Sequence, residues 1–384
     1  MGSSIPPPPS GLSAEGAHVL FLGAGRRTGP SRLLVFPVLL NLWPLLLLLS
    51  QKALVPVGLL LLGSASRLTR RNLVTVAWLI AVGGLSLLLQ PWNEFAAAHY
   101  LGFVLFLLSV PLINAAVRGS GEHLIKWLSI LSLSNALLAF LFYFLEVDLS
   151  QYRGLNRIVG DDDATHRVFY ETTSLLAVFS VTFLRKRWLR WICGAIVAAY
   201  ALLLAKSVFV ILLFLFNHLA PRILSGRVLS RIAVSAFFLG LAIGAPAMVA
   251  VARPDFALSV GMKLLQFDAV INDGSPILSG RGWGYVIDDV VTSTEQPYQV
   301  EMQLPMLLTQ VGLLVLIPYV VAMVSLFRSI SSSWTATMLR SAAYFAIGFA
   351  NPWLFVPSWY LTTALIFRRL DNHGRPRLVR IARV

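Results

Sequence analysis

Charged side chains are scarce in this chain. Lys, Arg, Asp and Glu make up 12% of its 384 residues, whereas 57% are hydrophobic. A soluble domain carries about twice that charged fraction, because polar side chains must cover its surface. The composition therefore excludes a soluble globular protein and indicates that lipid is the solvent for most of the chain.

Cysteine is nearly absent as well. The single cysteine, Cys193, lies within an apolar run, which excludes an internal disulfide and a thiolate metal site. The N-terminal segment, residues 1–32, is rich in Pro, Gly and Ser and predicts a flexible cytoplasmic tail rather than a signal peptide, because its apolar stretch His18–Leu22 is too short for one.

Long apolar runs predict an all-α membrane bundle of ten to twelve transmembrane helices, because a span needs about 20 apolar residues. The transmembrane domain covers residues 33–367, and a basic cytoplasmic tail covers residues 368–384. The predicted spans are Leu33–Leu49, Ala53–Ser66, Leu73–Leu89, Ala96–Val117, Leu124–Leu145, Val168–Leu184, Trp188–Ala205, Val208–Leu219, Val228–Val251, Leu304–Phe327, Leu339–Ala350 and Trp353–Phe367.

The distribution of Lys and Arg predicts the orientation of these spans. With twelve spans, 23 of the 31 basic residues fall in loops on one side, which is then the cytoplasmic side, and both termini lie there. The net charge of +14 reflects this bias, which attraction to anionic lipid head groups also favours. It is no evidence for nucleic acid, because no soluble module carries a basic patch interleaved with aromatic residues.

Two extracytoplasmic loops, residues 146–167 and 252–303, are long enough to hold a site. The first carries Arg153, Arg157, Asp161–Asp163 and Arg167, with Glu171 just beyond it. The three aspartates are either a solvated turn or ligands of a divalent ion. Arg167 and Glu171 share a helix face, where they form either a structural ion pair or part of a substrate site.

Three further candidates follow along the chain. Lys206 stands between two apolar runs, where it either snorkels to the interface or holds an anion. Arg281 lies in the turn Ser279-Gly-Arg281-Gly-Trp283-Gly-Tyr285, a plain tight turn or one whose backbone N–H groups and guanidinium approach phosphate. Glu301 precedes the tenth span, either as a solvated N-terminal acid or as a proton acceptor.

Taken in order, these segments resemble the O-antigen ligase/polymerase superfamily. Arg167-Val-Phe-Tyr-Glu171-Thr-Thr-Ser resembles the family's Arg-x-x-x-Glu-Pro-Ser segment, Leu202-Leu-Leu-Ala-Lys206-Ser207 its leucine run before Ser-Arg, and Gly282-Trp283-Gly284 its outer G-x-G turn. The segment from Glu301 to Gly312-Leu313 resembles its H-N-x-x-L-x-x-L-x-E-x-G-L motif, and Asn351-Pro352 also fits. Glu301 replaces the family's His, which favours a Wzy-type polysaccharide polymerase over a ligase.

The resemblance implies a glycosyltransferase of the bacterial inner membrane with its active site facing the periplasm. Its donor and acceptor are glycans linked to undecaprenyl diphosphate, and a chain-length regulator and a flippase are implied partners. No metal or cofactor is implied. Lys206 and Arg281 would stabilise the leaving diphosphate and Glu301 would accept the hydroxyl proton, while the substrate would be held by Arg153, Arg157, Arg167, Glu171, Arg253, Trp283 and Tyr285.

Two alternatives stay open at this stage. One is an O-antigen ligase of the same superfamily. The other is a flippase for the same lipid-linked glycan or another secondary transporter, because twelve spans with both termini inside are also typical of carriers. A carrier built from repeats would predict a counterpart of the long outer loop in the first six spans, and the sequence has none.

Overall fold

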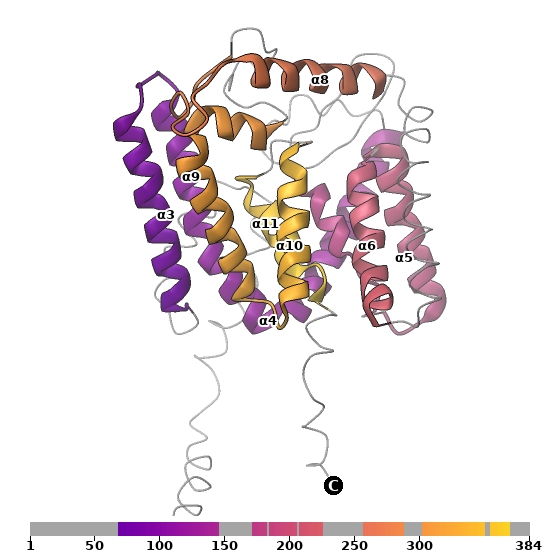
Figure 1. Cartoon of the computed structure of the whole chain (residues 1–384). Coiled ribbons are helices and arrows are strands. Elements are labelled where there is room, and N and C mark those ends of the chain that lie inside the picture. Colours follow the sequence, from indigo (N-terminus) through magenta and orange to yellow (C-terminus); the bar gives the residue numbers. More distant parts are fainter. Residues whose placement is uncertain are drawn as a thin grey trace, which may run out of the picture. The chain divides into compact units, whose positions relative to one another are not determined.

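The computed structural model describes residues 68–145, 171–182, 184–205, 207–225, 256–287, 302–349 and 354–368. All of them belong to the unit Leu40–Val384. Their regular elements are helices, and no strand occurs within these ranges. The elements are α3 (Arg70–Leu89), α4 (Ala96–Phe144), η3 (Glu171–Val178), α5 (Arg187–Ala199), η4 (Tyr200–Leu204), α6 (Val208–Ser225), α8 (Phe256–Asn272), α9 (Gln303–Arg328), α10 (Trp334–Ala346), η5 (Ile347–Phe349) and α11 (Pro357–Leu365) (Figure 1).

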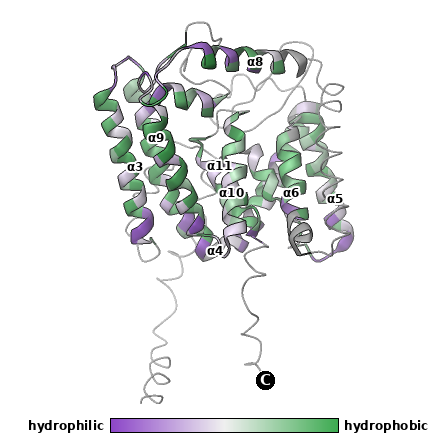
Figure 2. Cartoon of the chain, viewed as in Figure 1, coloured by the Kyte–Doolittle hydropathy of each residue, from purple (hydrophilic) through white to green (hydrophobic). Residues whose placement is uncertain are grey.

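Five segments of these ranges are long and apolar enough to cross a bilayer, whose hydrocarbon core is about 30 Å thick. The described part of the chain therefore has the architecture of a helical membrane protein, as the composition predicts. In Figure 2 the bodies of α3, α9 and α10 are hydrophobic, while hydrophilic residues collect at helix ends and on α8. The five segments are Arg70–Leu89, Ala96–Arg118, Gly121–Leu141, Arg187–Leu204 and Gln303–Arg328.

Basic residues from distant parts of the chain meet at one end of these helices. Arg71 donates to the Ser325 hydroxyl at 3.2 Å, and Arg118 donates to the Thr69 hydroxyl at 3.4 Å. Arg368 donates to the carbonyl of Val117 at 2.8 Å. We call this the basic end; its residues are among those that the charge pattern assigns to the cytoplasmic loops.

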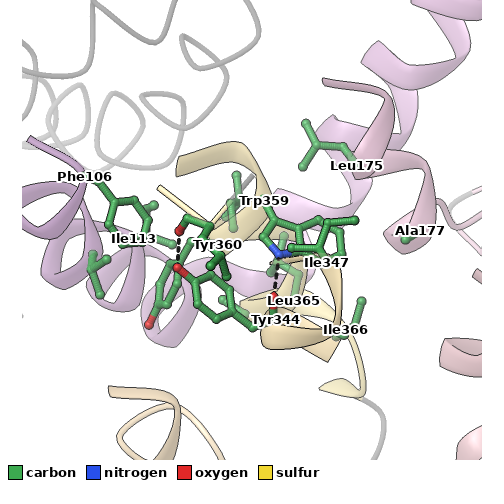
Figure 3. Packing of buried hydrophobic residues seen from close by; sticks show 14 of the residues in the cluster. Phe106, Ile113, Leu175, Ala177, Tyr344, Ile347, Trp359, Tyr360, Leu365 and Ile366 are labelled. Atoms are coloured by element: carbon green, nitrogen blue, oxygen red, sulfur yellow. Dashed lines mark hydrogen bonds between the residues drawn. The ribbon is translucent and has the colours of Figure 1, made fainter. Parts of the chain in front are cut away.

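The interior is aromatic and lies between α4, η3, α9, α10 and α11. The indole Nε1 of Trp359 donates to the Tyr344 carbonyl at 3.1 Å, and the rings of Phe327 and Tyr360 stack with centroids 4.9 Å apart. All residues of α11 are buried, so this helix of 9 residues is part of the core rather than a span. Figure 3 shows the packing of Phe106, Ile113, Leu175, Ala177, Tyr344, Ile347, Trp359, Tyr360, Leu365 and Ile366.

Several elements differ from the sequence prediction. Within the predicted span Val168–Leu184, the described residues form the 3-10 helix η3, followed from Phe179 by non-helical backbone. Thr173 in η3 is bonded to the hydroxyl of Tyr200 at 3.2 Å, and the N–H of Ser180 donates to the Ser129 hydroxyl at 2.9 Å. The Ser129 hydroxyl thus satisfies a main-chain N–H that a regular α-helix would bond to its own carbonyl.

The last two predicted spans also differ in their bounds. The helix α10 begins at Trp334, before the predicted start at Leu339, and only α11 is shorter than its predicted span. The segment Leu339–Ala350 contains the end of α10 and η5, and the segment Trp353–Phe367 contains α11. The helix α8 was not predicted at all, because the region 252–303 contains the polar residues of a loop. In Figure 1, α8 runs crosswise to α3 and α9. The predicted spans Leu33–Leu49, Ala53–Ser66 and Val228–Val251 lie outside the described residues.

Candidate functional site

The candidate site is built on a break in α9. At Gly312 the backbone has φ 64° and ψ −176°, which is not helical, and Figure 1 shows the two segments of α9 pointing in different directions. A break inside an apolar helix frees N–H and C=O groups that must find other partners in a membrane. The turn of residues 276–285 provides them.

Four main-chain hydrogen bonds join this turn to the break. The N–H groups of Arg281 and Gly282 donate to the carbonyls of Thr309 and Gln310 at 2.9 and 2.8 Å. In return, the N–H groups of Leu313 and Leu314 donate to the carbonyls of Ile277 and Leu278 at 2.9 and 3.1 Å. The turn is therefore held by backbone contacts with α9, so its position does not depend on the identity of most of its side chains.

Glycine is required where the turn approaches other backbone. Gly282 has φ 115°, and a Cβ atom added there would lie 2.6 Å from the carbonyl oxygen of Pro91. Gly284 has φ 73°, and its added Cβ would lie 2.6 Å from the carbonyl carbon of Phe95. Only glycine combines these dihedral angles with such close approach. The G-x-G pattern of this turn thus has a structural reason in this chain.

This geometry predicts that Gly282→Ala destabilises the protein more than Gly274→Ala does. Both residues have positive φ, so alanine strains the backbone at either one by roughly 1–3 kcal/mol. A Cβ at Gly274 meets no atom within 4 Å, whereas at Gly282 it meets Pro91. Thermal unfolding of the two variants in detergent measures the difference. Equal losses of stability would contradict the close packing of the turn.

Trp283 anchors the turn in the core. Its side chain is 1% exposed, and its Nε1 donates to the Gly83 carbonyl at 3.0 Å. The Phe103 ring lies 5.0 Å from it between centroids, and the His99 ring lies 5.2 Å away. A side chain with so little exposed surface offers none to a ligand in this structure. We therefore assign Trp283 a positioning role in place of the substrate contact expected from the sequence.

Arg281 projects from the same turn and is held on one side. Its Nε lies 3.2 Å from the Asp273 carboxylate and 3.1 Å from the Ser275 hydroxyl, and its Nη2 donates to the Asp273 carbonyl at 3.0 Å. The guanidinium carbon lies 5.4 Å from the centre of the Tyr285 ring, in a cation–π arrangement. None of the described residues accepts a hydrogen bond from Nη1, and the Arg281 side chain is 41% exposed. The guanidinium is thus oriented and still accessible.

Asp273 is a residue of this site that the sequence analysis did not predict. Its side chain is 8% exposed and accepts from Arg281, from the hydroxyl of Ser275, and from the Tyr285 hydroxyl at 2.9 Å. The sequence Asn272-Asp273-Gly274-Ser275 does predict a turn, because Asn, Asp, Gly and Ser are the residues that turns prefer. Nothing in the sequence showed that this turn meets Arg281. The predicted residue Tyr285 does join Arg281, through its ring and through Asp273.

A second feature concerns the chain around Lys206. The helix α5 continues into η4, a π-helical turn in which the N–H of Ala205 donates to the Tyr200 carbonyl at 2.8 Å, five residues back. π-Helical turns occur often at functional sites. The described neighbours of Lys206, Ala205 and Ser207, are both buried or nearly so.

Glu171 begins η3, and its side chain lies outside the described atoms. The described residues contain no group of three or more His, Cys, Asp or Glu side chains that could hold a metal ion. The remaining predicted residues lie outside the described ranges, and they are Arg153, Arg157, Asp161–Asp163, Arg167, Lys206, Arg253 and Glu301.

Comparison of the chain with protein-family models, with curated proteins and with solved structures finds no match.

Proposed function

We propose that this chain is an integral membrane glycosyltransferase that polymerises oligosaccharide repeats linked to undecaprenyl diphosphate, on the outer face of a bacterial inner membrane. The observation that carries the proposal is the oriented, accessible guanidinium of Arg281 on a glycine turn packed into a broken helix. Departure of a lipid diphosphate builds negative charge, which a fixed cation stabilises. The resemblance of the surrounding motifs to the O-antigen ligase/polymerase superfamily gives the substrate class.

The location of this turn supports the proposal. The helix α3 begins at the basic end with Arg70 and ends at Leu89, and the following Gln90 donates to the carbonyl of Ser279 in the turn. One membrane-spanning helix therefore separates the basic end from Arg281. The segment Arg187–Leu204 likewise leads from Arg185 and Lys186 to the chain just before Lys206. Positive loops mark the cytoplasmic side, so Arg281 and Lys206 are assigned to the outside.

This assignment predicts opposite labelling of the two ends. In a Cys193→Ser background, Ile277→Cys should react with an impermeant thiol reagent in intact spheroplasts, whereas Lys186→Cys should react only after lysis. Ile277 is 65% exposed in the structure, and Lys186 is also exposed. Labelling of Lys186→Cys in intact spheroplasts, with protection of Ile277→Cys, would invert the orientation.

A broken helix such as α9 also occurs in the second candidate class, lipid-linked glycan flippases and other secondary transporters. Transporters use discontinuous helices whose free main-chain groups bind substrates or ions. Here the N–H groups of Leu313 and Leu314 and the carbonyls of Thr309 and Gln310 are already bonded to the turn. These main-chain groups are therefore not free to bind a substrate or an ion, and this favours the glycosyltransferase over a transporter.

Reconstitution distinguishes these functions. The purified chain in proteoliposomes, supplied with a synthetic undecaprenyl-diphosphate-linked repeat, should give a ladder of longer lipid-linked products. A flippase would move the substrate without lengthening it, and a ligase would add glycan to a separate acceptor without forming the ladder. Absence of the ladder with substrate movement would support the transporter instead.

A further inference from the structure

A cavity at the basic end of the chain belongs to none of the features above. Its volume is about 480 Å³, which lies within the range of ligand pockets of roughly 300–1,000 Å³. The second half of α4, the end of η3 with the residues after it, α6 and the end of the α11 region form its walls. The residues that line it are Glu122, His123, Ile125, Lys126, Val178, Phe179, Ser180, Thr182, Asn217, His218, Leu365 and Arg368.

The polar groups of this cavity favour an anion. Lys126 and Arg368 are cations at neutral pH, and Glu122 is the one carboxylate among the lining residues. The ring of His123 adds a further polar group. The hydroxyls of Ser180 and Thr182 are bonded to each other at 2.9 Å, so one of the two can still donate outward, whereas Nδ1 of the His218 ring is bonded to the carbonyl of Phe214 at 2.9 Å. Phosphate oxygens accept such bonds, most strongly from charged donors.

Several contacts fix the shape of the cavity. Asn217 donates to the Ala177 carbonyl at 3.1 Å and accepts from the N–H of Phe367 at 2.7 Å, so it ties α6 to two other walls. Arg368 donates to the carbonyl of Val117, and its guanidinium lies where a Cβ of residue 121 would be. The glycine at position 121 therefore leaves the space that the guanidinium needs. These contacts leave Lys126, which is exposed, as the cation least involved in holding the fold.

The position of the cavity matches a membrane interface. It lies where the span Ala96–Arg118 ends and the span Gly121–Leu141 begins, and Ile125, Phe179 and Leu365 give it an apolar part beside the charges. Basic pockets between helices at the cytoplasmic interface bind anionic head groups. We propose that this cavity binds the phosphate group of an anionic ligand, supplied by a phospholipid head group or by a soluble phosphate.

Titration of the full-length chain in a nonionic detergent tests this site. The probes are phosphatidylglycerol, phosphatidylcholine with the same acyl chains, and inorganic phosphate, and native mass spectrometry measures each affinity. A lipid source predicts tighter binding of phosphatidylglycerol than of phosphatidylcholine, and Lys126→Gln should weaken the former about fivefold, as loss of one basic residue near a lipid phosphate does. A soluble source predicts that inorganic phosphate binds with the same dependence on Lys126, without a preference between the lipids.

Two further variants exclude a merely structural effect. Glu122→Gln removes the carboxylate of the cavity and should strengthen anion binding, opposite in direction to Lys126→Gln. Lys186→Gln removes an exposed lysine that does not line the cavity and should leave the affinities unchanged. The proposal is overturned if Lys126→Gln and Lys186→Gln behave alike with all three probes, or if Lys126→Gln and Glu122→Gln shift binding in the same direction.

Discussion

Replacing Arg281 by alanine is expected to slow chain growth by about a hundredfold or more while the protein stays folded in the membrane. Removal of one preorganised donor to a developing anion costs about 10²–10³ in rate in other enzymes. Arg281 is suited to this role because Nε and Nη2 are bonded to Asp273 and Ser275 while the side chain stays 41% exposed. The rate of ladder formation in proteoliposomes measures the effect.

Two controls separate this role from a structural one. Arg70→Ala removes an exposed arginine at the basic end and should leave the rate unchanged. Arg281→Lys keeps the charge but lacks the planar fork, so it cannot pair with Asp273 and contact a phosphate in the same way. It should retain part of the activity. Normal ladders from Arg281→Ala would mean that the diphosphate is held elsewhere, with Arg153, Arg157 and Arg253 as the next candidates.

Lys206 is expected to share this role with Arg281. Lys206→Ala should lower the rate by a similar factor, and Lys206→Arg should retain much of it, because the resembling family has arginine at this position. The π-helical turn η4 shortly before Lys206 is of a kind often found at functional sites.

The membrane helices were predictable because hydropathy and length determine them. Each of α3, α4, α5 and α9 begins or ends within a few residues of a predicted span, and the five spanning segments confirm a helical membrane protein. Hydropathy does not report whether an apolar segment faces lipid or protein. The apolar helix α11 lies within a predicted span, but all of its residues are buried inside the chain. Helix length distinguishes the two cases better than hydropathy does, because α11, with 9 residues, is too short to cross the bilayer.

The candidate site was predictable only in part. The glycines at 282 and 284 pointed to a special turn around Arg281, and the structure gives them positive φ values. The break at Gly312 gave no comparable signal, since an isolated glycine in a helical pattern is tolerated. The partners of the turn in α9 follow it by more than twenty residues. Such pairing depends on tertiary structure, which local patterns do not contain.

Asp273 raises the question of which carboxylate accepts a proton in the proposed reaction. Its oxygens already accept bonds from Arg281, Ser275 and Tyr285, and the side chain is 8% exposed. Little acceptor capacity remains for the hydroxyl of a sugar. Asp273 is therefore a positioning residue for Arg281, and the proton acceptor must be another residue.

We expect Glu301→Gln to abolish chain growth while the protein remains in the membrane. Glu301 occupies the position of the family's His and lies directly before Met302, which precedes α9, the helix that holds the Arg281 turn. The amide of Gln is nearly the same size as the carboxylate but is not basic, so loss of activity would indicate proton transfer rather than packing. Ladder formation by wild type and variant at equal protein levels measures this.

Recovery of activity by a second substitution at position 301 tests whether Glu301 is the proton acceptor. Glu301→His should recover part of the activity lost in Glu301→Gln, because imidazole accepts a proton at neutral pH and is the resembling family's own residue. Glu94 provides a matched control: it is a glutamate just before α4, and Glu94→Gln should leave ladder formation unchanged. Near-normal polymer from Glu301→Gln would refute Glu301 as the base. The acceptor would then be sought at Glu171 or among Asp161–Asp163, because three donors already occupy most of the acceptor sites of Asp273.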